Sequence, residues 1–349
     1  MRLFERLSIN SSKNYEVKFI PLKYNKEHSL IKFLEKLPYN KIKNILTKYN
    51  LDSQSLNKKA KINLLLNKLM DNITSFKTYM NNYQLKFVEK LIKNDGIIKY
   101  SPQYNGFLKL FYQYGLCIPI ICENEKSIIM PKEICKYFKD INDNIINLNT
   151  KITDYTRGMV NLYGIVENDY LVNEINKYIE IPLQNSYILK AIKFDIISND
   201  YITSENELIS NIFIIDYIDN YQNTRKTVPN YYPYTSEEII SSANPEYIRN
   251  DLTTKQHIIN IADIFNLSIE EAKDLMINLQ FILKEDINFH LLVSTFKDIN
   301  IDKIDQKLEY ILNINNNIPK WSLKGHKYHH LNLISPLTIK KIVELLLLN

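Results

Sequence analysis

Residues 96–131 constrain the fold of this chain more than any other stretch. They read GIIKYSPQYNGFLKLFYQYGLCIPIICENEKSIIMP. Ser101-Pro102 is a typical helix start, because proline suits the first helical position, and apolar residues then recur at helical spacing up to Gly115, a natural left-handed cap. Two β-branched runs follow on either side of a polar turn, and Pro131 opens another helix. The stretch therefore predicts a strand, a helix, a β-hairpin and a further helix.

This order, preceded by an amphipathic helix over residues 83–92, is typical of a winged helix-turn-helix. Such a unit would place the helix of residues 104–114 in a DNA groove and the hairpin against the backbone. The helix carries only one basic residue, Lys109, however, and glutamates surround Lys126 at the hairpin tip. Base reading normally uses more cations and amides. Winged helices also serve as protein-interaction modules, so both interpretations stay open.

Charge divides the chain into two unlike parts. The net charge is +5, but residues 1–140 hold 25 basic against 12 acidic residues, whereas the remainder holds 19 against 27. Such asymmetry suggests that the first part meets a large anion, of which nucleic acid is the commonest. The alternative is that solvated helices simply carry lysine.

Residues 30–72 read as helix, short loop and helix, with a lysine pair opening the second helix. This pattern resembles the SAP motif and the related Rho-factor N-terminal module, although Asn50 stands where those families have glycine. Asparagine tolerates the left-handed conformation, so the turn is expected to survive. The resemblance implies phosphate contacts through lysines, and the helix and the hairpin of the next unit add one lysine each. The expected nucleic-acid-binding residues are Lys41, Lys43, Lys48, Lys58, Lys59, Lys61, Lys109 and Lys126.

The tail of the chain carries a second resemblance, through Asn316, Asn317, Trp321, Gly325 and His326. A similar element occurs in poorly characterised bacterial and phage proteins that begin with a Rho-N-like module. Many of those proteins end in a cysteine-rich SEC-C zinc motif, which is missing here, so a zinc adaptor role is not carried over. The set has no established activity to transfer.

Capping boxes predict helix starts at Thr235, Thr253 and Ser268, and also at Ser204 just upstream. We expect a mainly α protein with a small β component. The expected organisation is a leader over 1–29, the SAP/Rho-N-like module over 30–72, a winged-helix-like domain over 73–143, a helical segment with a conceivable second winged helix over 144–222, and a C-terminal helical domain over 223–349, with a last helix from Ser335 to Leu348.

No catalytic constellation emerges from the sequence. It has no phosphate-cradling glycine loop and no zinc-protease or serine-hydrolase motif. His326, His329 and His330 are expected to form a surface cluster rather than a metal site, and no cofactor is expected. Three cysteines without a secretory signal, and no apolar run of membrane-spanning length, are typical of a cytoplasmic protein.

The sequence therefore predicts a non-enzymatic protein that binds nucleic acid, DNA ahead of RNA, through its basic half. The alternative is a scaffold or phage-type inhibitor whose acidic helical half binds a protein partner. A steep loss of affinity with salt distinguishes the first from the second, because phosphate contacts release counterions.

Overall fold

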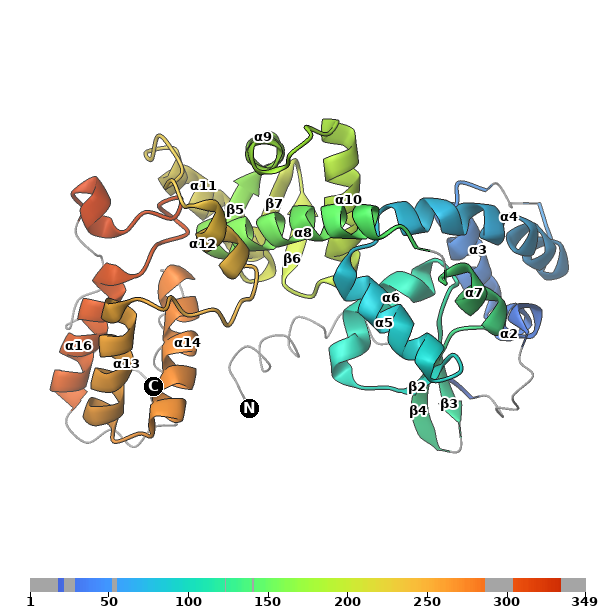
Figure 1. Ribbon diagram of the computed structural model, residues 1–349, viewed down its shortest axis with the longest axis horizontal. Helices are drawn as coiled ribbons and strands as arrows, with labels where there is room; N and C mark the ends of the chain where they lie inside the picture. Colours follow the sequence, from blue (N-terminus) through green and yellow to red (C-terminus); the bar gives the residue numbers. More distant parts are fainter. Residues whose placement is uncertain are drawn as a thin grey trace. The chain divides into compact units, whose positions relative to one another are not determined.

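The computed structural model describes residues 18–21, 29–51, 55–122, 124–139, 141–285 and 304–333. The chain divides into two compact units (Figure 1). The first contains the described residues up to 153 together with residues 183–200, and the second contains residues 154–182 and those from 201 onward. Helices dominate both units and each holds one small sheet, which confirms the mainly α class with a small β component.

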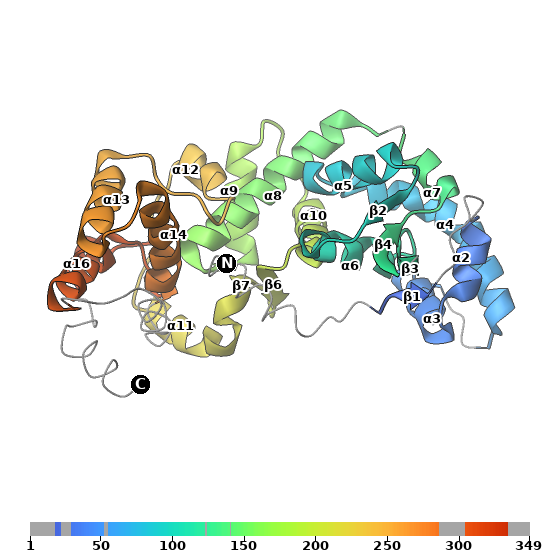
Figure 2. The ribbon, with the colours of Figure 1, turned by 90° about the horizontal axis from the view of Figure 1, so that it is seen from below.

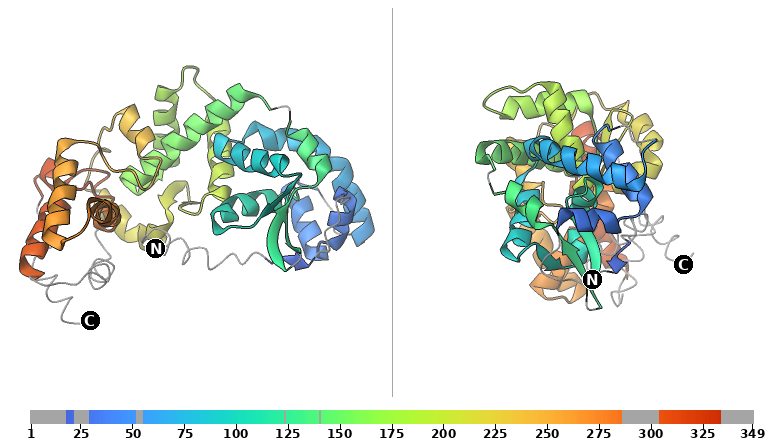
Figure 3. Two further views of the ribbon diagram at one scale, coloured as in Figure 1. Left: turned by 60° about the horizontal axis from the view of Figure 1, so that its bottom comes forward. Right: turned by 90° about the vertical axis from the view of Figure 1, so that its right-hand side faces the viewer.

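The sheet of the first unit has the strand order β1-β3-β4-β2. The predicted hairpin is present, with β3 antiparallel to β4 and Ile118 opposite Ile129. β2 pairs antiparallel with β4 on the far side, and the two-residue β1 runs parallel to β3. Figure 3 shows the hairpin as the green pair of strands beside the blue helices. The strands are β1 (Ile20–Pro21), β2 (Ile97–Lys99), β3 (Ile118–Cys122) and β4 (Glu125–Ile129).

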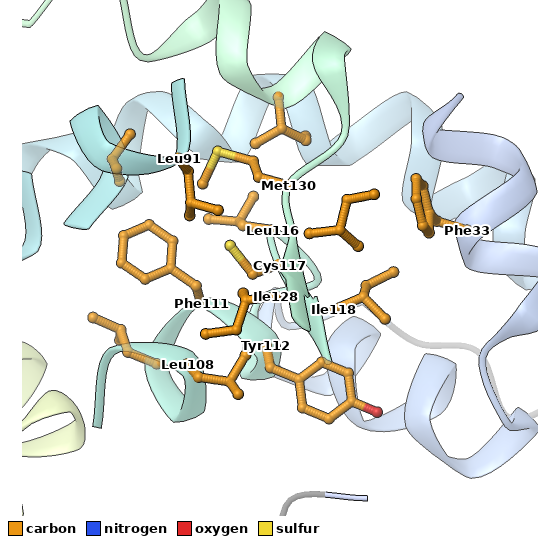
Figure 4. Packing of buried hydrophobic residues seen from close by; sticks show 14 of the residues in the cluster. Phe33, Leu91, Leu108, Phe111, Tyr112, Leu116, Cys117, Ile118, Ile128 and Met130 are labelled. Carbon is orange, nitrogen blue, oxygen red and sulfur yellow. The ribbon is translucent and has the colours of Figure 1, made fainter. Parts of the chain in front are cut away.

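Helices of the first unit enclose this sheet around one continuous apolar core. Figure 4 shows Leu91, Leu108, Phe111 and Ile128 converging from two helices and the hairpin. Gly115 takes the predicted left-handed conformation at φ 70°, which lets the chain turn directly from helix into hairpin. The helices are α5 (Asn82–Lys93), α6 (Asn105–Gln113), which follows the 3₁₀ turn η2 (Pro102–Tyr104), and α7 (Lys132–Tyr137).

Three lysine-bearing helices pack beside the sheet of the same unit (Figure 2). The apolar faces of the second and third are buried, and Asn50 between them has φ 55°, so the predicted left-handed turn is confirmed. A further helix precedes the predicted pair, and the last one continues past residue 72. They are α2 (Leu30–Lys36), α3 (Tyr39–Lys48) and α4 (Lys58–Thr78).

α10 (Asn185–Ser198) packs against α6 within the first unit, although the two helices begin 80 residues apart in the sequence. Gly106 makes the approach possible, because a Cβ there would lie 2.1 Å from the Ser198 carbonyl oxygen. Polar groups also join α10 to the start of α5, since the Asn81 amide donates to Asp195 at 2.7 Å and the Gln84 amide donates to Ser198 at 2.9 Å. α10 therefore belongs to the core of the first unit.

The second unit repeats the strand arrangement of the first. Its sheet has the order β5-β7-β6, so the first strand again pairs with the second strand of a hairpin. The helix start predicted at Ser204 is wrong, because Ser204 lies in β6 and Asn206-Glu207 form the hairpin turn with positive φ. The strands are β5 (Ile165–Glu167), β6 (Ile202–Glu205) and β7 (Leu208–Asn211).

The remainder of the second unit is helical, and α13, α14 and α16 lie side by side (Figures 1 and 2). The capping boxes at Thr235 and Ser268 are confirmed. The start expected at Thr253 is displaced, because Asp251 caps the helix and accepts from the Thr254 amide. The helix expected from Ser335 lies outside the described residues. The elements are α8 (Asp143–Tyr163), which begins in the first unit, α9 (Asn168–Tyr178), η3 (Ile212–Tyr217), α11 (Ile218–Arg225), α12 (Ser236–Ser241), α13 (Leu252–Phe265), α14 (Ile269–Glu285), α16 (Ile304–Asn317) and η4 (Tyr328–Leu331).

Trp321, the only tryptophan, packs in the core of the second unit. Its side chain is fully buried, and its indole N–H donates to the Asn161 carbonyl at 2.9 Å. The ring lies against Gly164, where a Cβ would come within 2.5 Å of it. The buried guanidinium of Arg225 donates to the carbonyls of Tyr163, Ile165 and Trp321. Trp321 of the tail element is therefore a packing residue of this unit.

We expect Trp321→Ala to lower the free energy of unfolding of the second unit by about 3–5 kcal/mol, because it leaves a large cavity and an unpaired Asn161 carbonyl. Gly164→Ala should also destabilise, since the added Cβ meets the indole at a position of positive φ. Urea unfolding followed by far-UV circular dichroism measures both. Ile259→Ala, at a half-exposed position on α13, is the control and should stay within about 0.5 kcal/mol of the parent.

Candidate functional site

The eight lysines expected to bind nucleic acid occupy different environments. Lys61 is fully buried, with its ammonium 4.8 Å from the centre of the Tyr39 ring. Lys41 lies 3.5 Å from the centre of the Tyr112 ring, and burial lowers its pKa to about 8. Lys58 donates to the Glu35 carbonyl oxygen at 2.7 Å. These three side chains hold the helices of the first unit together.

Lys43, Lys48 and Lys59 are exposed on α3 and at the start of α4. Their surroundings are strongly basic, because residues 29–78 hold ten lysines and only three acidic residues. α3 also ends on Lys48, which complements the negative end of its helix dipole. Of the predicted lysines on these helices, Lys43, Lys48 and Lys59 are therefore the ones whose ammonium groups are accessible to an anion in solution.

Lys109 and Lys126 belong to the helix–hairpin part of the first unit. Lys109 is half-buried on α6, and its charge opposes the burial that raises the pKa of Asp200. Lys126 is exposed on β4, with its ammonium 5.1 Å from the centre of the Phe19 ring. On the neighbouring strand Lys99 pairs with Glu125 at 2.7 Å. The hairpin therefore carries mixed charge, as its sequence suggested.

α6, the helix expected to enter a DNA groove, is largely enclosed. Leu108, Leu110, Phe111 and Tyr112 are all buried, and α10 covers the helix at Gly106. The nucleic-acid role of this helix stays a prediction, but the surface that α6 presents to solvent is small.

A second group of charged and titratable side chains lines a pocket of the second unit, which the sequence analysis did not predict. The pocket encloses about 200 Å3 between the end of α8, the loop before α13, the end of α14 and the segment after α16. Three cations line it: Arg249, Lys284 and Lys327. Asp251 and His257 face the same space, and Tyr234, Tyr247, Met276 and Ile314 form part of its wall.

Burial and mutual repulsion set the electrostatics of this pocket. Burial, with Arg249 nearby, lowers the pKa of Lys284 to about 8. Burial and Arg249 also lower the pKa of Lys327, which Asp251 partly opposes. The Lys284 ammonium donates to the Asn161 side chain at 3.2 Å, and Arg249 contacts the carboxylate of Glu238. The pocket thus concentrates positive charge in a partly desolvated place.

The sequence pattern does not predict that these residues lie close together. Arg249, Lys284 and Lys327 stand in three separate segments, and each alone is typical of a solvated cation. The one local signal was Asp251, which could have been recognised as a helix cap ahead of Thr253. Convergence of the three cations depends on the path of the chain after α16, which Trp321 fixes.

Within the described part of the chain, no group of three or more histidine, cysteine, aspartate or glutamate side chains is placed to hold a metal ion. The thiols of Cys117 and Cys135 are buried and Cys122 is half-buried, and none forms a disulfide. Burial raises the pKa of Cys117 well above its usual value. Among the described residues, no helix has the length and apolar character needed to cross a membrane.

Comparison with protein-family models, with curated protein sequences and with solved structures found no match to this chain. Function must therefore be argued from the residues themselves.

Lys284 should give the stability of the second unit a distinct pH dependence. In the folded state its pKa is about 8, against an ordinary value of 10.5, so folding penalises the charged form. Relative to Lys284→Met, the parent should gain about 1.4 kcal/mol of unfolding free energy per pH unit between pH 8 and about 10.5.

The measurement is urea unfolding of both proteins across this pH range. Lys273→Met removes an exposed lysine from the same helix and should show a pH-independent difference. A flat difference for Lys284→Met as well would show that its ammonium is not desolvated.

Proposed function

We propose that the protein is a non-enzymatic nucleic-acid-binding protein that holds phosphates with the exposed lysines of α3 and α4. The observation that carries this proposal is the excess of lysine over acidic residues in residues 29–78, together with the exposure of Lys43, Lys48 and Lys59. Packed lysines such as Lys41 and Lys61 support the same function indirectly, because they fix the two helices that present the exposed ones.

The mode of binding that fits best is backbone contact with little base reading. Phosphate contacts fix position and carry no sequence information, and they need only accessible cations. The enclosed α6 offers few groups to base edges, so groove insertion of this helix contributes little to the proposal. A duplex and a single strand both present phosphates, and DNA is the first substrate to test.

The winged-helix assignment is part of the same proposal. In each unit a helix leads into a first strand, one α-helix of that unit follows, and a hairpin returns so that its second strand pairs with the first. This strand order supports two units of winged-helix type in one chain. Winged helices position nucleic acid in some proteins and bind protein partners in others, and the exposed lysines of α3 and α4 are the reason to propose the first role here.

We expect the full chain to bind a DNA duplex of about 20 base pairs with an affinity that falls steeply with salt. The variant Lys43→Gln/Lys48→Gln/Lys59→Gln should reduce the slope of log K against log salt by up to about 3, because each lost phosphate contact removes about 0.9 from it. Fluorescence anisotropy at several salt concentrations gives the slope.

A matched variant removes three exposed lysines from the second unit, Lys226→Gln/Lys255→Gln/Lys273→Gln. It changes the net charge equally and should leave the slope nearly unchanged. Equal effects of the two variants would refute a localised interface. Absence of DNA and RNA binding at low salt, with recovery of one stoichiometric protein partner, would favour the scaffold alternative.

A further inference from the structure

Three cations from distant parts of the sequence converge on the pocket of the second unit. Arg249 precedes α13, Lys284 is next to the last residue of α14, and Lys327 precedes η4. Nothing in the packing of an apolar core requires three such groups in one cavity of about 200 Å3. Bringing like charges together without a function is unfavourable, and here burial first and the charge of Arg249 second lower the pKa values of both lysines.

Acidic neighbours offset this charge only in part. Glu238 contacts Arg249, and Asp251 is directed to the backbone amide of Thr254 at 2.7 Å as a helix cap. Counting these two acids against the three cations leaves a positive balance around the cavity. An anion placed among Arg249, Lys284 and Lys327 would relieve the repulsion, since each cation would gain a partner of opposite charge.

His257, which lines the same pocket, has a ring nitrogen with unused hydrogen-bonding capacity. The Nε2 atom of His257 is buried and has no hydrogen-bond partner among the described residues, while its Nδ1 lies 2.7 Å from the Tyr310 hydroxyl. When Nδ1 accepts from that hydroxyl, Nε2 carries the proton and is a donor. The N-terminus of α13, a helix of 14 residues, also lines the pocket through Thr253 and adds partial positive charge.

Part of the pocket wall is apolar and aromatic. Tyr247, Met276, Ile314 and Ile318 belong to it. A pocket lined by both cations and apolar residues suits a small molecule with an anionic group and an organic body. Arginine with two lysines is a frequent combination for phosphate, because the guanidinium offers paired donors and the ammonium groups add point charges.

We propose that this pocket binds a small phosphorylated organic molecule, with the phosphate held by Arg249, Lys284 and Lys327 and the organic body against the apolar wall. The site is separate from the lysines of α3 and α4 and does not depend on nucleic-acid binding. Its volume suits a phosphate monoester of modest size and is too small for a nucleic-acid strand.

The experiment uses calorimetric titration of the full-length protein at pH 7 and low salt. The probes are phenyl phosphate, inorganic phosphate, benzoate and phenol. Phenyl phosphate should bind at one molecule per chain, inorganic phosphate more weakly because it does not use the apolar wall, and the other two weakly or not at all. Lys284→Met and Lys327→Gln should each weaken phenyl phosphate binding at least tenfold.

Lys273→Gln, from the exposed side of the same helix as Lys284, is the control and should bind as the parent does. Lys284→Met removes a desolvated charge, so it should stay folded, and circular dichroism checks this. Binding of phosphate should also take up protons at pH 8.5, because it stabilises the charged forms of Lys284 and Lys327. Titration in two buffers of different ionisation enthalpy measures this uptake in the presence of the neighbouring titratable groups Asp251, His257, Tyr234 and Tyr247.

Several outcomes would overturn the proposal. No binding of phenyl phosphate at 10 mM, or equal binding by Lys284→Met and Lys327→Gln, would show that the cations do not form a phosphate site. Tighter binding of benzoate would assign a carboxylate ligand instead, and equal binding of phenol would assign an apolar one. Competition by a DNA duplex with phenyl phosphate would place the pocket in the nucleic-acid interface.

Discussion

The buried guanidinium of Arg225 is the interaction on which the second unit depends most. It donates to three backbone carbonyls, of Tyr163, Ile165 and Trp321, that lie at the end of α8, in β5 and in the segment after α16. Hydrogen bonds to a charged donor are stronger than neutral ones, and losing the donor would leave buried acceptors unpaired. Arg225 thereby holds together the end of α8, β5 and the segment after α16. Residues next to the end of α8 and in the segment after α16 line the cation-bearing pocket.

Lysine serves two opposite purposes in this chain. Lys41 and Lys61 in the first unit and Lys284 in the second have left bulk solvent, two of them over tyrosine rings and one inside a pocket. Lys43, Lys48 and Lys59 stay in solvent, where their charge is available to a ligand. A lysine pattern in the sequence therefore overstates the size of an anion-binding surface, since it counts structural and accessible ammonium groups together.

Local structure followed well from local chemistry. The hairpin after Gly115, the turn at Asn50 and the caps at Thr235 and Ser268 all depend on residues within a few positions of one another. Ser204 failed because Asn206-Glu207 form a hairpin turn, and the strand pairing that stabilises it involves β5, nearly 40 residues earlier. The pocket was out of reach for the same reason, because three remote segments assemble it and no periodicity links them.

The route of the chain through the two units has a consequence for synthesis. Residues 183–200 complete the first unit, yet residues 154–182 of the second unit precede them. During translation the surface around Gly106 therefore stays uncovered until the 71 residues between α6 and α10, and then α10 itself, have left the ribosome. A truncation placed at the apparent end of the first domain, near residue 143, would make this transient exposure permanent, so such a fragment is a poor substitute for the intact protein.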